Sequence, residues 1–143
     1  MPERPRLLVV LSRTNYTNEL VRECGTLSIT VLGRDHLPLL EPLGLHSGRD
    51  GDKLAGLDYE LDAEGNPVFP GGAGALSCRV IDQYEMGDST AFLSAVSGRT
   101  EGQALPLTWR AARGVVGEAF LARWAEKSAR EQEAARAAMK WAM

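Results

Sequence analysis

The sequence predicts a small, mainly β domain with some α-helix, followed by a long C-terminal helix. Short apolar segments, rich in strand-forming residues and separated by glycine, proline and polar turns, fill the first four fifths of the chain. From Gly114 onward the chain is rich in alanine, glutamate, lysine and arginine and has no proline, which is the composition of a helix. The length of 143 residues suits one domain. We therefore expect a domain over residues 1–113 and a helix over residues 114–143.

The first third of the chain predicts two strands with a helix between them. Leu7–Leu11 is a continuous apolar run, which predicts a strand buried on both faces. Apolar residues then recur at helical spacing from Tyr16 to Cys24, and Gly25 is placed to end this helix. Thr26–Leu32 alternates apolar and polar residues, as a half-buried strand does.

The middle of the chain predicts a short helix and a hairpin. Asp35 is placed to cap a helix over Leu37–Leu43. Leu76–Ile81 and Thr90–Val96 are apolar segments around a glycine turn, which predicts two paired strands. Leu105–Trp109 is expected to form a last strand.

The C-terminal helix carries Val116, Phe120 and Trp124 on one stripe. We expect its first half to pack on the domain or on a partner subunit. Beyond Ala135 two alternatives stay open: a solvated, frayed tail, or a second contact made by an apolar patch that includes Trp141.

Composition and charge exclude several classes of function. The net charge is −3 with no basic stretch, so a nucleic-acid partner is not expected. No apolar run is long enough for a signal peptide or a membrane span, so we expect a cytoplasmic protein with no membrane contact. Cys24 and Cys78 form no metal-ligand pattern, and each is expected to be a small buried side chain; no metal site is expected.

Two polar loops are the candidate binding sites. The first delivers hydroxyl, amide and guanidinium groups to a predicted helix start, where backbone N–H groups favour an anion. Simple helix capping is the alternative reading of the same residues. The second loop combines a hydroxyl, a glycine and charged groups able to clamp a phosphate, although such loops are also often merely solvated. The candidate binding residues are Ser12, Arg13, Thr14, Asn15 and Thr17 in the first loop and Ser47, Gly48 and Lys53 in the second.

No catalytic residue can be assigned from the sequence. His46 borders the second loop and is either a proton donor or an ordinary surface residue. Trp109 and Tyr84 are either rings that stack on a planar ligand or residues of the core or an interface.

Five segments in order resemble the flavin reductase-like family, whose domain is an FMN-binding split β-barrel. They are Leu7–Ser12, Asn15–Leu20, Cys24–Leu32, Ser47–Gly56, and Leu76–Val80 with Gly87-Asp88. The resemblance implies a flavoprotein that binds FMN, or FAD, near a homodimer interface. It also implies hydride transfer from NADH or NADPH to the flavin, and a monooxygenase partner for the reduced flavin. Ser12 to Thr17 would line the ribityl-phosphate side of the flavin, with Ser47 and Lys53 reaching it from the second loop.

The sequence departs from this family at three places, one of which is the closing segment Leu105–Arg110, where the family's usual Tyr-Arg-Gly-Arg sequence is missing. The family has two further strands before the position of Leu7, so the domain is expected to be shortened at its N-terminus. Ser89 stands where the family usually has histidine after Gly-Asp. Two alternatives to a flavin reductase therefore stay open: a non-catalytic carrier of flavin or another small ligand, and a degenerate domain that serves assembly through its C-terminal helix.

Overall fold

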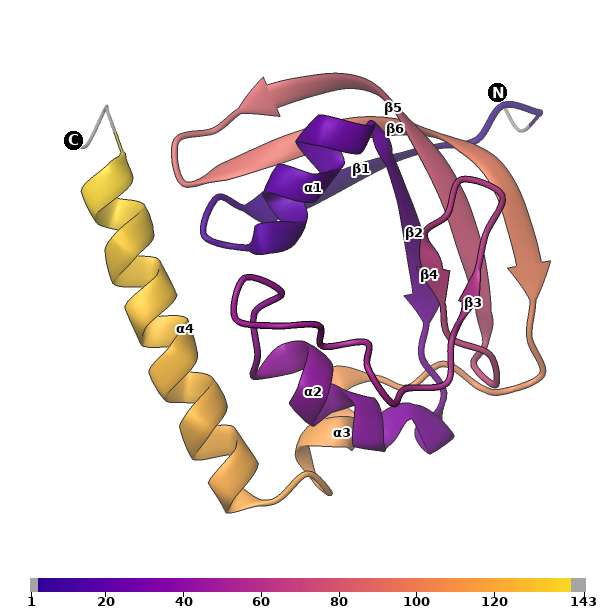
Figure 1. Ribbon diagram of the computed structural model, residues 1–143. Coiled ribbons are helices and arrows are strands. Elements are labelled where there is room, and N and C mark those ends of the chain that lie inside the picture. Colours follow the sequence, from indigo (N-terminus) through magenta and orange to yellow (C-terminus); the bar gives the residue numbers. More distant parts are fainter. Residues whose placement is uncertain (1–2, 140–143) are drawn as a thin grey trace.

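The computed structural model describes residues 3–139 and shows a curled antiparallel sheet with helices at its inner side and one end (Figure 1). The main sheet has the strand order β1-β6-β5-β2, and β3 and β4 form a separate small hairpin. The strands are β1 (Arg6–Ser12), β2 (Thr26–Val31), β3 (Glu60–Leu61), β4 (Pro67–Val68), β5 (Gly74–Glu85) and β6 (Ser89–Glu101). The helices are α1 (Tyr16–Cys24), the 3-10 helix η1 (Arg34–Leu39), α2 (Leu40–Gly44), α3 (Trp109–Arg113) and α4 (Glu118–Ala138).

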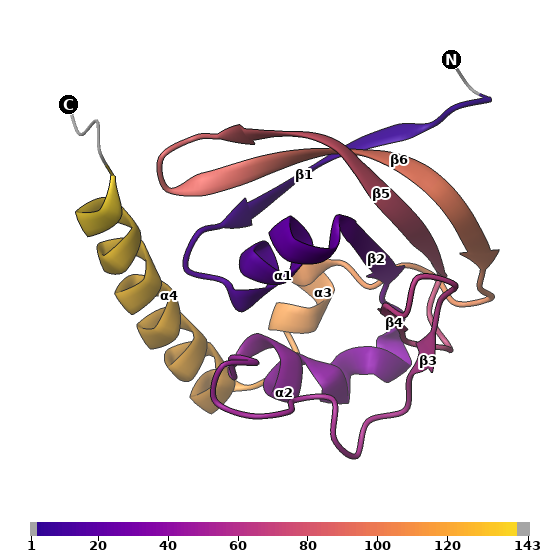
Figure 2. The same ribbon diagram turned by 45° about the horizontal axis from the view of Figure 1, so that its top comes forward.

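The long β5–β6 hairpin forms the centre of the sheet and bends around α1 (Figure 2). Its pairing register shifts between Ser77 and Cys78 and again between Val80 and Asp82. Extra residues of this kind bend a strand and increase its twist. The hairpin therefore curls, and β1 and β2 are placed on its two outer edges.

The core lies between the inner face of the sheet and α1. Val21 of α1, Leu27 of β2, Cys78 of β5 and Phe92 of β6 are buried together. The prediction of α1, β2 and the hairpin is confirmed, and the paired strands extend further than the apolar segments that predicted them.

The prediction that the first strand is buried on both faces is wrong. Leu7, Val9 and Leu11 pack against the core, whereas Leu8 is 61% exposed and Val10 is 52% exposed. The reason is that alternate side chains of β1 point to the outer face of the sheet, where none of the described residues 3–139 buries Leu8 or Val10.

The segment after β2 begins earlier than predicted and is capped differently. Gly33, rather than Asp35, is the N-cap of η1, and its N–H donates to Nδ1 of His36 over 3.1 Å. Nε2 of the same ring lies 2.7 Å from the carbonyl oxygen of Pro70. The buried His36 therefore joins the start of η1 to the segment before β5.

The predicted last strand over Leu105–Trp109 is also wrong. Residues 105–108 are irregular, and Thr108 caps α3 by accepting a hydrogen bond from the N–H of Ala111 over 3.1 Å. Threonine is a favoured N-cap residue because its side-chain oxygen can accept a hydrogen bond from a free N–H of the first helical turn. Without a neighbouring strand to pair with, this segment starts a helix instead.

The predicted C-terminal helix is present as α4. Its first half packs through Trp124 against Trp109, with ring centroids 5.2 Å apart. The helix continues to Ala138, and Ala135 in its second half is buried; Trp141 lies outside the described residues. Within residues 3–139 no helix is long and apolar enough to cross a membrane.

Candidate functional site

A cavity of about 720 Å³ lies between α1, the loop before residue 54, β2 and α4. Residues from both polar loops that were predicted as binding sites line this cavity. The predicted residues on this wall are Thr14, Asn15, Thr17, Ser47, Gly48 and Lys53. Two segments that are more than 25 residues apart in the chain are thus brought together at one site.

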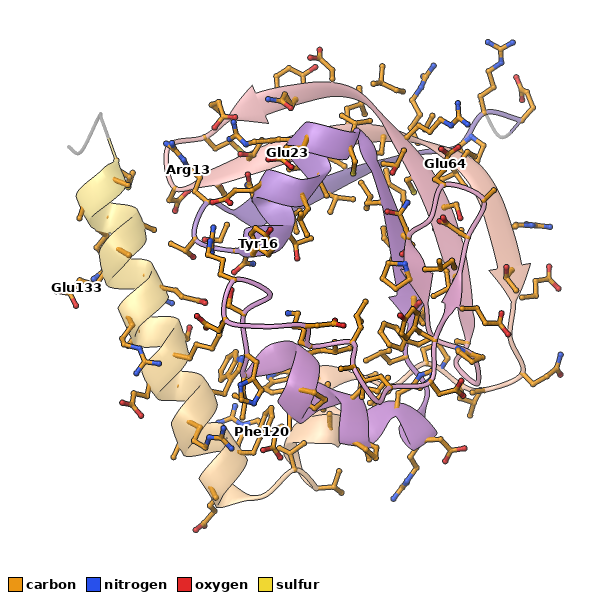
Figure 3. All side chains as sticks on the ribbon, viewed as in Figure 1. Arg13, Tyr16, Glu23, Glu64, Phe120 and Glu133 are labelled. Carbon is orange, nitrogen blue, oxygen red and sulfur yellow. The ribbon has the colours of Figure 1, made fainter. Side chains whose placement is uncertain are left out.

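The other two predicted residues lie at the border of this cavity. Ser12 lines a neighbouring, smaller cavity, and its hydroxyl is hydrogen-bonded to the hydroxyl of Thr14 over 2.9 Å. Arg13 turns toward the tip of the β5–β6 hairpin, where its guanidinium donates to the carbonyl oxygen of Gly87 over 3.2 Å (Figure 3). Arg13 therefore supports the loop from outside the main cavity.

Lys53 is held in place by backbone carbonyls at the edge of the second loop. Its ammonium group donates to the carbonyl oxygens of Leu43, over 3.0 Å, and His46, over 3.2 Å. Partial burial lowers the pKa of Lys53, and the positive charge of Lys127 lowers it further, while Glu131 acts in the opposite direction. Neither of these two α4 residues was among the binding residues predicted from the sequence.

Arg49 joins the two loops. Its guanidinium donates to the carbonyl oxygen of Thr14 over 2.9 Å and forms an ion pair with Glu19 of α1. It also lies over the ring of Tyr16, 5.1 Å from the ring centroid, where a cation is attracted to the π system. Three contacts from one side chain thus fix the second loop on the first turn of α1.

Gly48 lies where the second loop packs against Tyr16, and there is little room for a side chain there. A Cβ atom at this position would lie 2.8 Å from Cδ1 of Tyr16, which is closer than carbon atoms pack. The Tyr16 ring lies between α1 and the second loop (Figure 3). Glycine therefore lets the loop backbone pack directly on that ring.

Several residues on the cavity wall were not predicted from the sequence. Tyr16, Phe69 and Trp124 supply aromatic surface, and Lys127 and Glu131 of α4 supply charge. Trp124, Lys127 and Glu131 are spaced by three and four residues, so they share one face of the helix. That spacing is the signal that could have identified them.

The remaining candidates are divided between the wall and the exterior. His46 lines the cavity. Tyr84 is half exposed on β5 and Trp109 packs on Trp124, and neither of these two rings is on the cavity wall.

Cys78 is buried as expected, whereas Cys24 is exposed at the end of α1, where it borders the cavity. Residues 3–139 contain no group of three His, Cys, Asp or Glu residues placed to hold a metal ion.

The cavity has the size of a small-molecule site and a wall of mixed chemistry. Its volume lies within the range of about 300–1,000 Å³ that small-molecule sites occupy. Hydroxyl and amide groups gather near the start of α1, and the rest of the wall combines aromatic and aliphatic side chains with the charged groups of the second loop and α4. A flavin nucleotide has this distribution of polar and apolar surface.

Comparisons with known proteins agree with this description. Residues 2–115 match the model of the flavin reductase like domain. The chain is 30% identical over 99 residues to the FMN reductase (NADH) RutF 2 of Methylorubrum extorquens, which covers 68% of this chain and 56% of that protein.

Two solved structures have a similar fold. The NADH:FAD oxidoreductase SgcE6 of Streptomyces globisporus superposes with a TM-score of 0.65 at 22% identity, covering 71% of this chain and 61% of that one. An FMN-binding protein from Thermus thermophilus gives a TM-score of 0.64 at 25% identity, covering 71% and 57%. The chain thus spans between 56% and 61% of the length of these three relatives.

The Arg49 linkage predicts a local effect of substitution. In Arg49→Gln the loop of residues 46–53 loses its ion pair and its contact with Tyr16, so its backbone amides should exchange hydrogen faster. The free energy of unfolding should change by less than about 1 kcal/mol, because the pair is partly exposed. Hydrogen-exchange mass spectrometry measures the first quantity and denaturant unfolding the second. Arg99→Gln, which removes an exposed ion pair to Glu101, is the matched control; equal exchange in both variants would contradict the linkage.

Proposed function

Because the chain belongs to the flavin reductase-like family and has its split-barrel fold, we propose that it is an FMN-binding flavoprotein that accepts hydride from NADH or NADPH. The observation that carries the proposal is the convergence of both polar loops on one cavity of suitable size. FAD is the alternative flavin. We assign residues 1–113 to the flavin-binding domain and residues 114–143 to a C-terminal helical segment.

The first loop and the start of α1 would bind the ribityl-phosphate side of the flavin. Thr14, Asn15 and Thr17 present side-chain donors there, beside the first N–H groups of α1, which carry partial positive charge. Ser12 holds the hydroxyl of Thr14 in position, and Arg13 adds positive charge at the border. These groups bind and orient the ligand.

The second loop would reach the same ribityl-phosphate side of the ligand from its own part of the wall. Ser47 and Lys53 line the cavity there, and Gly48 leaves room for the Tyr16 ring. Because Arg49 fixes this loop on α1, the two sets of donors are held at a constant spacing before the ligand arrives. Such preorganisation reduces the entropy lost on binding.

The redox chemistry would come from the bound flavin, which accepts a hydride from the nicotinamide ring together with one proton from solvent. The contribution of the protein is position and charge. His46 is the histidine on the cavity wall and is the candidate for handling that proton. The reduced flavin would then serve an acceptor, for which a monooxygenase is the partner that the family suggests.

We also infer that the protein is a homodimer. β1 has a strand neighbour on one side only among residues 3–139, and Leu8 and Val10 on its outer face are more than half exposed. An apolar edge strand of this kind is an aggregation hazard unless another chain covers it. A second copy would supply that cover.

Flavin binding is tested by titrating the purified protein with FMN and following flavin fluorescence. The wild type should bind FMN, and Thr17→Val and Ser47→Ala should each weaken binding by about tenfold, the cost of one lost hydrogen bond to the ligand. Thr100→Val, at the exposed end of β6, is the control and should bind as the wild type does. A wild-type protein that takes up neither FMN nor FAD would refute the proposal.

Hydride transfer is tested separately from binding. With FMN bound and oxygen excluded, addition of NADH or NADPH should bleach the flavin spectrum and consume the nicotinamide in equal amount. Bound flavin that stays oxidised with both donors would instead support the non-catalytic carrier.

The homodimer is tested by sedimentation. Leu8→Lys combined with Val10→Lys should convert a dimer to a monomer, because two charges would be buried without partners in the interface. Leu61→Lys, at an equally exposed leucine of the β3–β4 hairpin, should leave the dimer intact. A monomeric wild type would overturn the inference.

A further inference from the structure

The helix α4 brings a second positive charge to the cavity. Lys127 and Lys53 both line the wall, one from α4 and one from the loop after α2. Both side chains are partly buried on this one wall, and the positive charge of Lys127 lowers the pKa of Lys53, which is the direction expected for two cations that share a cavity. Like charges that approach each other away from bulk water repel, and this repulsion is relieved when an anion binds between them.

Each lysine is held in a way that leaves capacity for a ligand. An ammonium group has three N–H donors, and Lys53 uses two of them on the carbonyls of Leu43 and His46. Lys127 is paired with Glu131 one turn further along the helix. Because Glu131 also lines the cavity, an anionic ligand would compete with its carboxylate for Lys127.

Of the two other charged residues near the two lysines, Asp52 lines the cavity wall and Arg49 does not. Asp52 accepts a hydrogen bond from the N–H of Leu54 over 3.0 Å and so is engaged by its own turn. Arg49 is engaged by Glu19 and the carbonyl of Thr14. Lys53 and Lys127 are thus the cations that face the cavity with donors to spare.

We propose that Lys127 of α4, together with Lys53, binds a phosphate group of the nucleotide ligand, and that Glu131 competes with this phosphate for Lys127. The inference rests on the proposed function for the identity of the ligand. It adds a binding residue from a helix that lies outside residues 2–115, which match the family model. Lys127 is therefore a residue that sets affinity and selectivity for phosphorylated ligands.

The test compares FMN with riboflavin, which lacks the phosphate. In Lys127→Gln the dissociation constant for FMN should rise by about tenfold while that for riboflavin stays unchanged, since one charge-assisted hydrogen bond is lost. In Glu131→Gln, FMN should bind a few-fold more tightly and riboflavin as before. NADH is titrated in parallel: a loss confined to NADH would assign the pair to the dinucleotide phosphates, and a loss confined to FMN to the flavin phosphate.

Two exposed residues of the same helix give matched controls. Arg130→Gln removes a positive charge that is paired with Glu126 in solvent. Glu133→Gln removes a negative charge that points away from the body of the protein (Figure 3). Neither should change any of the three dissociation constants. Equal losses for FMN and riboflavin in Lys127→Gln, or no loss for any phosphorylated ligand, would overturn the proposal.

A measurement without flavin tests the phosphate site independently of flavin binding. Pyrophosphate should raise the melting temperature of the wild type, because a ligand that binds the folded state stabilises it, and this rise should be lost in Lys127→Gln. If the wild type binds no flavin but shows this difference, the flavin proposal fails and the phosphate site stands. If pyrophosphate affects both proteins equally, the phosphate site fails, whatever flavin does.

Discussion

The packing of α1 across the inner face of the β5–β6 hairpin is the contact on which the rest of the structure depends. β1 and β2 lie on opposite edges of that hairpin, so the helix that joins them must cross it. Val21 fills the core beneath the crossing, and the buried Asn18 donates to the carbonyl oxygen of Leu11 in β1 over 3.0 Å. Arg22 bonds both Asn18 and Thr90 of β6, at 2.8 and 2.7 Å. Apolar burial and a satisfied polar cluster together fix the helix in one position.

The candidate site follows from that position. Once α1 is fixed, its first turn faces the space beneath the sheet, and Tyr16 presents a ring onto which only a glycine backbone can pack. Gly48 has no side chain and can pack on this ring. Arg49 then holds the loop through its ion pair with Glu19 and its hydrogen bond to the carbonyl oxygen of Thr14. The binding loops are therefore held by contacts to a helix rather than by regular strand pairing. A ligand bound as proposed would therefore meet donors that are already in place.

The sequence predicts the local elements well and their environment less well. The α1 helix, β2 and the central hairpin follow from periodicity and glycine placement, which depend on neighbours in the chain. The burial of Leu8 and Val10 depends on whether another element covers the outer face of the sheet, and no periodicity contains that information. The spacing of Trp124, Lys127 and Glu131 places them on one face of α4, but which part of the domain this face meets depends on tertiary contacts such as Trp124 with Trp109. Leu105–Trp109 has a strand composition but no available strand neighbour, and Thr108 caps a helix instead.

The residues of the cavity wall come from two parts of the chain, only one of which lies within the match to the family. Both polar loops lie within residues 2–115, which match the family model, whereas Trp124, Lys127 and Glu131 belong to α4, which begins at Glu118. The helix is attached through a ring pair and an exposed ion pair between Arg123 and Glu41, contacts that are individually weak. A ligand that bridges Lys53 and Lys127 would add a contact between α4 and the domain, so binding and the docking of this helix would stabilise each other. The ligand preference of this protein is then set partly by a segment that lies outside the match to the family.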